Sequence, residues 1–183
     1  MRRANAHKNT CSLSDSYQLS TCLWFPGQSE WIKFTSPEGR FSVSLPHEPK
    51  LETISDPETK NLVNYRDTDL ETGYAFICEY FDIPNPRPDL DESLNVTRDG
   101  IVRGAGATLV REEKISLYGY PGRELDLSLT VNSGTIMSAR TRIYIVGSRV
   151  YSLTYVRVKD MDSTLAADIA TKFFSSFKVT PNK

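Results

Sequence analysis

Three β-strands in direct succession, between Tyr120 and Lys159, constrain the fold of this chain more than any other stretch. From Leu125 to Val131 the apolar residues stand at every second position, with polar residues between them. A period of two means that one face of a strand is buried and the other faces water. Turns at Asn132-Ser133-Gly134 and at Gly147-Ser148 separate the strands, and the second is typical of a tight hairpin. The sequence therefore predicts an antiparallel meander.

The last strand of this meander, Arg149 to Val158, is apolar on both faces near its middle. The strand predicted from Tyr74 to Phe81 has the same property. A strand that is apolar on both faces lies inside a sheet that other layers cover on each side. We therefore expect both strands to be central, with further elements packed above and below them.

The first of two predicted helices begins at Asp89, which is a favourable N-cap residue. Glu92 stands three residues later and completes a capping box. Apolar and small side chains then recur at steps of three and four over Leu90 to Ile101, which is one helical stripe. Gly104 and Gly106 favour the end of the helix.

The second helix is predicted from Ser163 to about Lys178, with Asp162 or Ser163 as its cap. Its apolar stripe steps by four and is widened by a further aromatic residue: Leu165, Ile169, Phe173, Phe177 and Phe174. Burying each phenylalanine stabilises the fold by roughly 1.5 to 3 kcal/mol. This helix must therefore pack across the sheet.

The remaining strands are predicted at 31–34, 41–45, 51–55, 61–66 and 108–117. The first two form one hairpin and the next two form another, so the sheet is mainly antiparallel. We therefore expect an α+β fold, an α/β/α sandwich around a mainly antiparallel sheet of about six to eight strands with two principal helices.

Composition excludes several classes of function. The net charge of the 183 residues is −1, which gives no electrostatic reason to expect nucleic acid or an anionic membrane surface as a partner. No apolar run reaches the length of about 18 residues that a transmembrane helix needs. The three cysteines, Cys11, Cys22 and Cys78, have no short spacing, which argues against a disulfide framework and a zinc site.

We expect residues 1–30 to be a flexible leader and residues 31–183 to form a single domain, because the leader is polar and lacks periodicity. The leader has basic residues but no uninterrupted apolar stretch, so it does not match an export signal. A true start codon upstream would give an extracytoplasmic protein instead. The sequence leaves the compartment open.

Catalytic motifs are absent from the sequence: there is no phosphate-binding loop, no His-Glu-x-x-His pair and no Gly-x-Ser-x-Gly elbow. His47 lies in a loop, where it is either an exposed side chain or a general base held by a carboxylate. Asp67 to Glu71 has carboxylates at alternate positions, as calcium loops do, but it also fits a hairpin tip. We predict no catalytic residue, no metal site and no cofactor.

Basic residues gather on the meander, where they either form an anion-binding face or pair with Glu124 and Asp126 across the strands. Tyrosines accompany them, and protein interfaces favour arginine together with tyrosine. The candidate interaction surface consists of Tyr120, Arg123, Arg140, Arg142, Tyr144 and Arg149.

Four stretches in this order resemble the bacterial branch of the PsbP/Mog1-like superfamily: 34–46, 118–124, 142–153 and 173–177. The similarity extends from Trp31 to Val179. It implies an α/β/α sandwich around an antiparallel sheet. Superfamily members act mostly by binding: a photosystem II subunit in plants, a partner of a Ran-type GTPase in fungi, and lipoproteins and secretion chaperones in bacteria. They share no catalytic motif, so the resemblance carries no functional residue over.

The resemblance therefore implies a non-enzymatic protein-binding or assembly-factor module with an unidentified protein partner. The alternative is a carrier of calcium or a small ligand, held by the loop from Asp67 to Glu71 or by a cleft between sheet and helix. A small enzyme that uses His47 is the third hypothesis.

Overall fold

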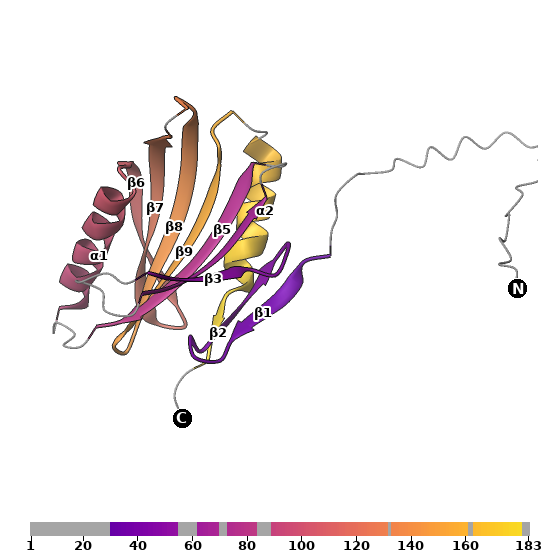
Figure 1. The fold of residues 1–183 in the computed structure, drawn as a ribbon. Coiled ribbons are helices and arrows are strands. Elements are labelled where there is room, and N and C mark those ends of the chain that lie inside the picture. The colour runs from indigo at the N-terminus through magenta and orange to yellow at the C-terminus, as the bar shows by residue number, and fades with distance from the viewer. Residues whose placement is uncertain are drawn as a thin grey trace, which may run out of the picture.

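Two helices lie on opposite faces of a seven-stranded antiparallel sheet in the computed structural model (Figure 1), which describes residues 30–54, 62–69, 73–83, 89–131, 133–160 and 163–180. The helices are α1 (Leu90–Gly104) and α2 (Ser163–Ser176). From edge to edge, the strands are β3 (Lys50–Ile54), β4 (Leu62–Asp69), β5 (Tyr74–Asp82), β9 (Arg149–Val158), β8 (Ile136–Val146), β7 (Tyr120–Thr130) and β6 (Thr108–Leu117). The predicted α+β sandwich is confirmed.

A second, three-stranded sheet packs beside α2. Its strands are β1 (Ile32–Ser36), β2 (Phe41–Leu45) and β10 (Lys178–Val179), in the order β1-β2-β10. The predicted N-terminal hairpin therefore forms, but it pairs with the end of the chain and not with the main sheet. Buried Phe41, Val43 and Leu45 join it to the α2-side core.

The predicted meander is confirmed, because β7, β8 and β9 pair antiparallel in succession. Gly147 adopts a positive φ of 65° in the hairpin turn between β8 and β9, a conformation that glycine takes without steric cost. As expected for strands that are apolar on both faces, β9 lies at the centre of the sheet and β5 lies beside it.

Helix α1 begins as predicted. The Asp89 side chain accepts hydrogen bonds from the backbone N–H groups of Asp91 and Glu92, at 2.9 and 3.3 Å. Leu94 is fully buried and packs against Leu125 and other apolar residues of one sheet face, which we call the α1 face.

Helix α2 packs on the opposite face, the α2 face, through three phenylalanines that are buried as predicted: Phe173, Phe174 and Phe177. The predicted place of Leu165 in the stripe is wrong, because this side chain is 53% exposed. The first turns of the helix bury Ala166 and Ala170 instead. The buried stripe is thus rotated relative to the spacing of the large apolar residues.

Several sequence predictions fall outside the described residues. These are the leader up to residue 29 with Cys11 and Cys22, and the capping role of Asp162. Among the described residues, no helix has the length and apolar character required to cross a membrane.

Candidate contact face and charge networks

Strand alternation divides the six predicted contact residues between the two faces of the sheet. Arg123 of β7 points to the α1 face, as its contacts with Asp91 and Glu112 show. Arg142 and Tyr144 of β8 point to the α2 face, where they contact Phe174 and Phe177. The six residues therefore do not form one continuous surface.

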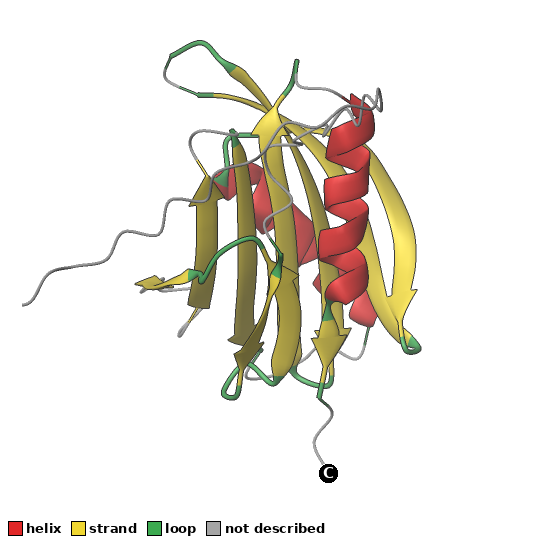
Figure 2. Ribbon diagram, turned by 90° about the vertical axis from the view of Figure 1, so that its right-hand side faces the viewer, coloured by secondary structure: helices red, strands yellow, loops and turns green. Residues whose placement is uncertain are grey.

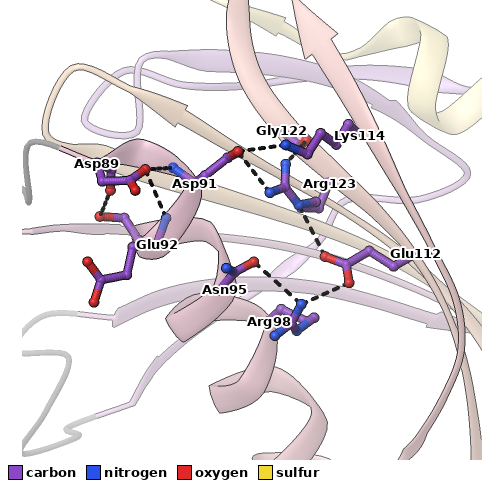
Figure 3. A network of polar contacts seen from close by, with 10 residues as sticks. Asp89, Asp91, Glu92, Asn95, Arg98, Glu112, Lys114, Gly122 and Arg123 are labelled. Atoms are coloured by element: carbon purple, nitrogen blue, oxygen red, sulfur yellow. Dashed lines mark hydrogen bonds and ion pairs between the residues drawn. The ribbon is translucent and has the colours of Figure 1, made fainter.

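The α1 face holds a network of charges beneath helix α1 (Figure 3). Arg123 is only 5% exposed, and its guanidinium donates to Asp91 Oδ1 at 2.8 Å and to Glu112 Oε1 at 3.1 Å. It also donates to the carbonyl oxygen of Gly122 at 3.3 Å. A buried guanidinium with several acceptors is satisfied and leaves little capacity for an external partner.

Neighbouring side chains extend this network between helix and strands. Lys114 of β6 donates to Asp91 Oδ2 at 2.6 Å, and Arg98 of α1 donates to Glu112 Oε2 at 2.8 Å. The hydrogen bonds from Lys114 and Arg123 hold the pKa of Asp91 below its usual range. The network therefore joins α1 to β6 and β7, and sequence spacing does not indicate it.

The α2 face carries a second network across β6, β7 and β8. Arg140 Nε donates to Asp126 Oδ1 at 2.7 Å, and Arg142 Nε donates to Glu124 Oε2 at 2.6 Å. Arg111 donates to Asp126 Oδ2 at 3.1 Å. The predicted alternative of cross-strand pairing is thus confirmed for Arg140 and Arg142.

We call this second network the charged face: Arg111, Glu113, Glu124, Asp126, Arg140 and Arg142. Its three arginine side chains are 32–44% exposed, whereas Glu124 is 9% exposed. Burial alone would raise the pKa of Asp126, but the hydrogen bonds and charges of Arg140 and Arg111 outweigh it and lower that pKa. Figure 2 shows that α2 covers only part of the sheet on this side, while α1 lies behind it.

Exposed side chains flank the charged face at the two ends of β6. Val110 is 67% exposed near the start of the strand, and Tyr118 is 68% exposed in the turn after it. Tyr118 has a positive φ of 53°, which is rare for an aromatic residue. Tyr120, the first residue of β7, is half-buried.

Tyr144 and Arg149 are buried in packing contacts. The Tyr144 ring stacks on Phe177, with centroids 6.2 Å apart. Arg149 forms two hydrogen bonds of 2.6 Å with Asp82 and one of 2.6 Å with the Glu38 carbonyl oxygen, which fastens the small sheet to the large one. Burial therefore makes three of the predicted contact residues inaccessible to a partner: Arg123, Tyr144 and Arg149.

His47 is an exposed loop residue that also lies beside a carboxylate, so the structure agrees with both sequence alternatives in part. Its backbone N–H and its Nδ1 lie 3.0 and 3.3 Å from the two carboxylate oxygens of Asp67. The imidazole is half-exposed at a shallow hollow of about 310 Å³ that Lys50 and Arg66 also line. Both carboxylate oxygens thus face the His47 loop.

The structure also has a cleft between sheet and helix, as the ligand-carrier hypothesis supposed. Its volume is about 380 Å³, and it lies between the first half of α2 and strands β7 to β9. For metal ions, the described ranges contain no cluster of three or more histidine, cysteine or acidic residues suited to binding one. Leu70 and Glu71 of the calcium hypothesis lie outside these ranges.

No protein-family model and no curated protein matches this chain. Solved structures do match. Cyanobacterial PsbP of Synechocystis superposes with a TM-score of 0.59 at 15% identity, over 88% of this chain and 99% of that chain. LpqN of Mycobacterium tuberculosis, involved in cell envelope biogenesis, gives 0.50 at 16% identity over 77% and 83%. The Ran-binding protein Mog1p of Saccharomyces cerevisiae gives 0.50 at 10% identity over 84% and 97%. The chain therefore has the PsbP/Mog1-like fold, as its sequence motifs indicated.

Proposed function

We propose that this protein is a non-enzymatic protein-binding or assembly-factor module that contacts its partner through the charged face. The observation that carries this proposal is the half-exposed network of Arg111, Arg140 and Arg142 with three carboxylates, beside a helix that covers only part of the sheet. Arginine and tyrosine are enriched in the centres of protein interfaces.

The charged face is ordered before a partner arrives. Asp126 holds both Arg140 and Arg111, and Glu124 together with the Phe174 ring holds Arg142. Side chains that are already fixed lose less conformational entropy on binding. Three cations and three anions in a fixed arrangement favour a partner with the complementary arrangement over a partner with one uniform charge.

Proteins of similar fold support a binding role, since Mog1p is a Ran-binding protein. The geometry at His47 supports a structural role for that residue. Asp67 is buried in β4 and engages the backbone N–H as well as the ring of His47. This arrangement fixes the path of the loop, so we assign the His47–Asp67 pair to the fold and not to catalysis.

A photo-crosslinking amino acid at Arg140 tests the contact directly, with Thr171 on the exposed side of α2 as the matched control position. We expect discrete crosslinked products in the source cells from position 140 and none from position 171. Equal crosslinking at both positions would contradict the proposal.

A charge swap tests specificity. The double variant Arg140→Asp with Asp126→Arg keeps an ion pair across β7 and β8 but inverts its direction. We expect this variant to fold and to lose the crosslinked products obtained from a second reporter at Arg111. Unchanged products would show that the partner does not recognise these charges.

A further inference from the structure

The cleft between α2 and the main sheet differs from the rest of the α2 interface in how it is filled. On the helix side it is lined by three alanines of α2 that precede Phe173: Ala166, Ala167 and Ala170. On the sheet side it is lined by Val110 of β6 and by residues of β7, β8 and β9. A volume of about 380 Å³ lies within the range typical of small-molecule sites.

The C-terminal end of the same helix, together with Phe177 directly after it, leaves no such space. Phe173 packs against Phe76 with ring centroids 5.1 Å apart, and Phe177 packs against Tyr151 at 5.7 Å. Protein interiors are normally packed to this density. The change from phenylalanine to alanine within one helix therefore produces the cleft.

One of the residues that line this cleft, Tyr155, carries a buried hydroxyl. Tyr155 is 3% exposed and lines the cleft, and its hydroxyl has no hydrogen-bond partner in the described part of the chain. Burial raises the pKa of Tyr155, so the hydroxyl keeps its proton and remains a donor. An unsatisfied buried hydroxyl costs free energy, which a bound acceptor would recover.

Cations outnumber anions around the cleft: Arg140, Arg157 and Lys159 stand against Asp126. Arg157 Nη1 donates to the carbonyl oxygens of Val158 and Lys159, at 3.3 and 2.8 Å, which holds its guanidinium at this end of β9. The excess of positive charge favours an anionic ligand.

We propose that this cleft binds a compact organic anion, with a carboxylate or phosphate near Arg157 and Lys159 and a short apolar body against the alanines of α2. The Tyr155 hydroxyl donates to an oxygen of the ligand. The inference goes beyond the protein-binding role. The cleft shares Asp126 and Arg140 with the charged face, but the proposed ligand is held by Arg157, Lys159 and the alanines of α2, which lie outside that face.

Nuclear magnetic resonance titration of the full chain tests this with three probes that share a phenylalkyl body and differ in their charged group: 3-phenylpropanoate, 3-phenylpropyl phosphate and 3-phenylpropylamine. We expect both anions to shift the amide signals of Ala139, Ala166 and Ala170 and to bind about tenfold or more tightly than the amine. The tighter anion identifies the ligand as a carboxylic acid or a phosphate ester. Equal binding of the amine, or no binding of any probe at about 10 mM, overturns the proposal.

Variants separate a ligand role from a structural one. Ala170→Leu should fill the cleft and abolish binding, while Thr171→Leu, on the exposed side of the same helix, should leave binding unchanged. If Ala170→Leu does not fold, the exposed Ala167→Leu should obstruct the same cleft. Retained binding in a folded Ala170→Leu or Ala167→Leu variant overturns the proposal.

Tyr155→Phe removes only the hydroxyl. We expect about fivefold weaker binding of the anions with an unchanged or higher melting temperature, because the hydroxyl has no partner to lose. A fall in melting temperature without any loss of affinity would show a purely structural role for this hydroxyl and would contradict its place in the site. Arg140 lines the cleft as well as the charged face, whereas Arg111 belongs to the charged face alone. Crosslinking to a protein from a reporter at Arg111 therefore reports on the protein contact separately, so either proposal can fail alone.

Discussion

The two faces of the central sheet both carry ion-pair networks, yet they differ in what covers them. On the α1 face, Arg123 lies under a helix and is 5% exposed. On the α2 face, Arg140 is 39% exposed although its carboxylate partner lies as close as those of Arg123. Pairing distances alone therefore do not distinguish a structural network from an available surface.

This difference arises within two consecutive residues of β7. Arg123 and Glu124 point to opposite faces, and Glu124 contributes to the charged face through Arg142. A buried arginine loses its hydration and must be compensated by its partners, whereas a half-exposed one keeps part of it. Removing the buried arginine should therefore lower the free energy of unfolding much more than removing the half-exposed one.

The largest expected effect is on stability. Arg123→Met should lower the free energy of unfolding by about 3 kcal/mol, because it leaves Asp91 and Glu112 without their buried partner. Arg140→Met should cost about 1 kcal/mol or less, as is usual for pairs at the surface. Urea unfolding of the two variants measures the difference. Equal costs would show that coverage by α1 does not separate the two networks.

The second-largest expected effect on stability is at Gly122, the residue before Arg123. Gly122 lies so close to β8 that an added Cβ would overlap the Ile143 carbonyl oxygen and lie 2.6 Å from the Tyr144 ring. Gly122→Ala should therefore destabilise the fold by about 1 to 3 kcal/mol. Gly119→Ala, in the adjacent turn, is the useful contrast, since open space surrounds Gly119 and only its positive φ of 87° opposes the change. If Gly122→Ala left the free energy of unfolding unchanged, β7 and β8 would have to move apart at this position at little cost.

The elements whose pattern is local could be predicted from the sequence. Alternation identified β7, β8 and β9, and Asp89 marked the start of α1 correctly because its capping contacts involve only the next three residues. The pairing of Arg140 with Asp126 followed in the same way, since neighbouring strands of a meander lie side by side.

Properties that depend on distant segments could not be predicted in the same way. Nothing local indicates that β1 and β2 leave the main sheet and pair with the two residues of β10. The burial of Arg123 does have a local signal, because Arg123 is in phase with Leu125 and Leu127 on the face that α1 covers. Leu165 was misplaced because small alanines, and not the large apolar residues, form the buried stripe at that end of α2.

A smaller effect is expected in the turn between β6 and β7. Tyr118 and Gly119 both have positive φ, at 53° and 87°, which is the turn type that favours Asn-Gly. Tyr118→Asn should therefore raise the free energy of unfolding by about 1 kcal/mol. If the exposed Tyr118 ring belongs to the protein contact, the same variant should weaken crosslinking from Arg140. Tyr118→Phe keeps the ring and should change neither quantity.

The smallest expected effect is on the pH dependence of the free energy of unfolding. Because Lys114 and Arg123 lower the pKa of Asp91 in the folded protein, this carboxylate stabilises the fold above its ordinary pKa of about 3.9. That contribution is lost as the pH falls through the lower pKa of the folded state. Asp91→Asn should therefore be less stable than the parent at pH 7 and should lose less additional stability below pH of about 4.

Urea unfolding at several pH values checks this dependence, with Asp91→Glu as the control that keeps a carboxylate next to Lys114 and Arg123. An unchanged slope of unfolding free energy against pH in Asp91→Asn would show that Asp91 does not gain from these cations in the folded state. The cost of losing Arg123 would then have to arise mainly from Glu112 and from the carbonyl oxygen of Gly122. In that case the α1-face network would stabilise the fold only through the contacts of Arg123 with Glu112 and with the Gly122 carbonyl oxygen.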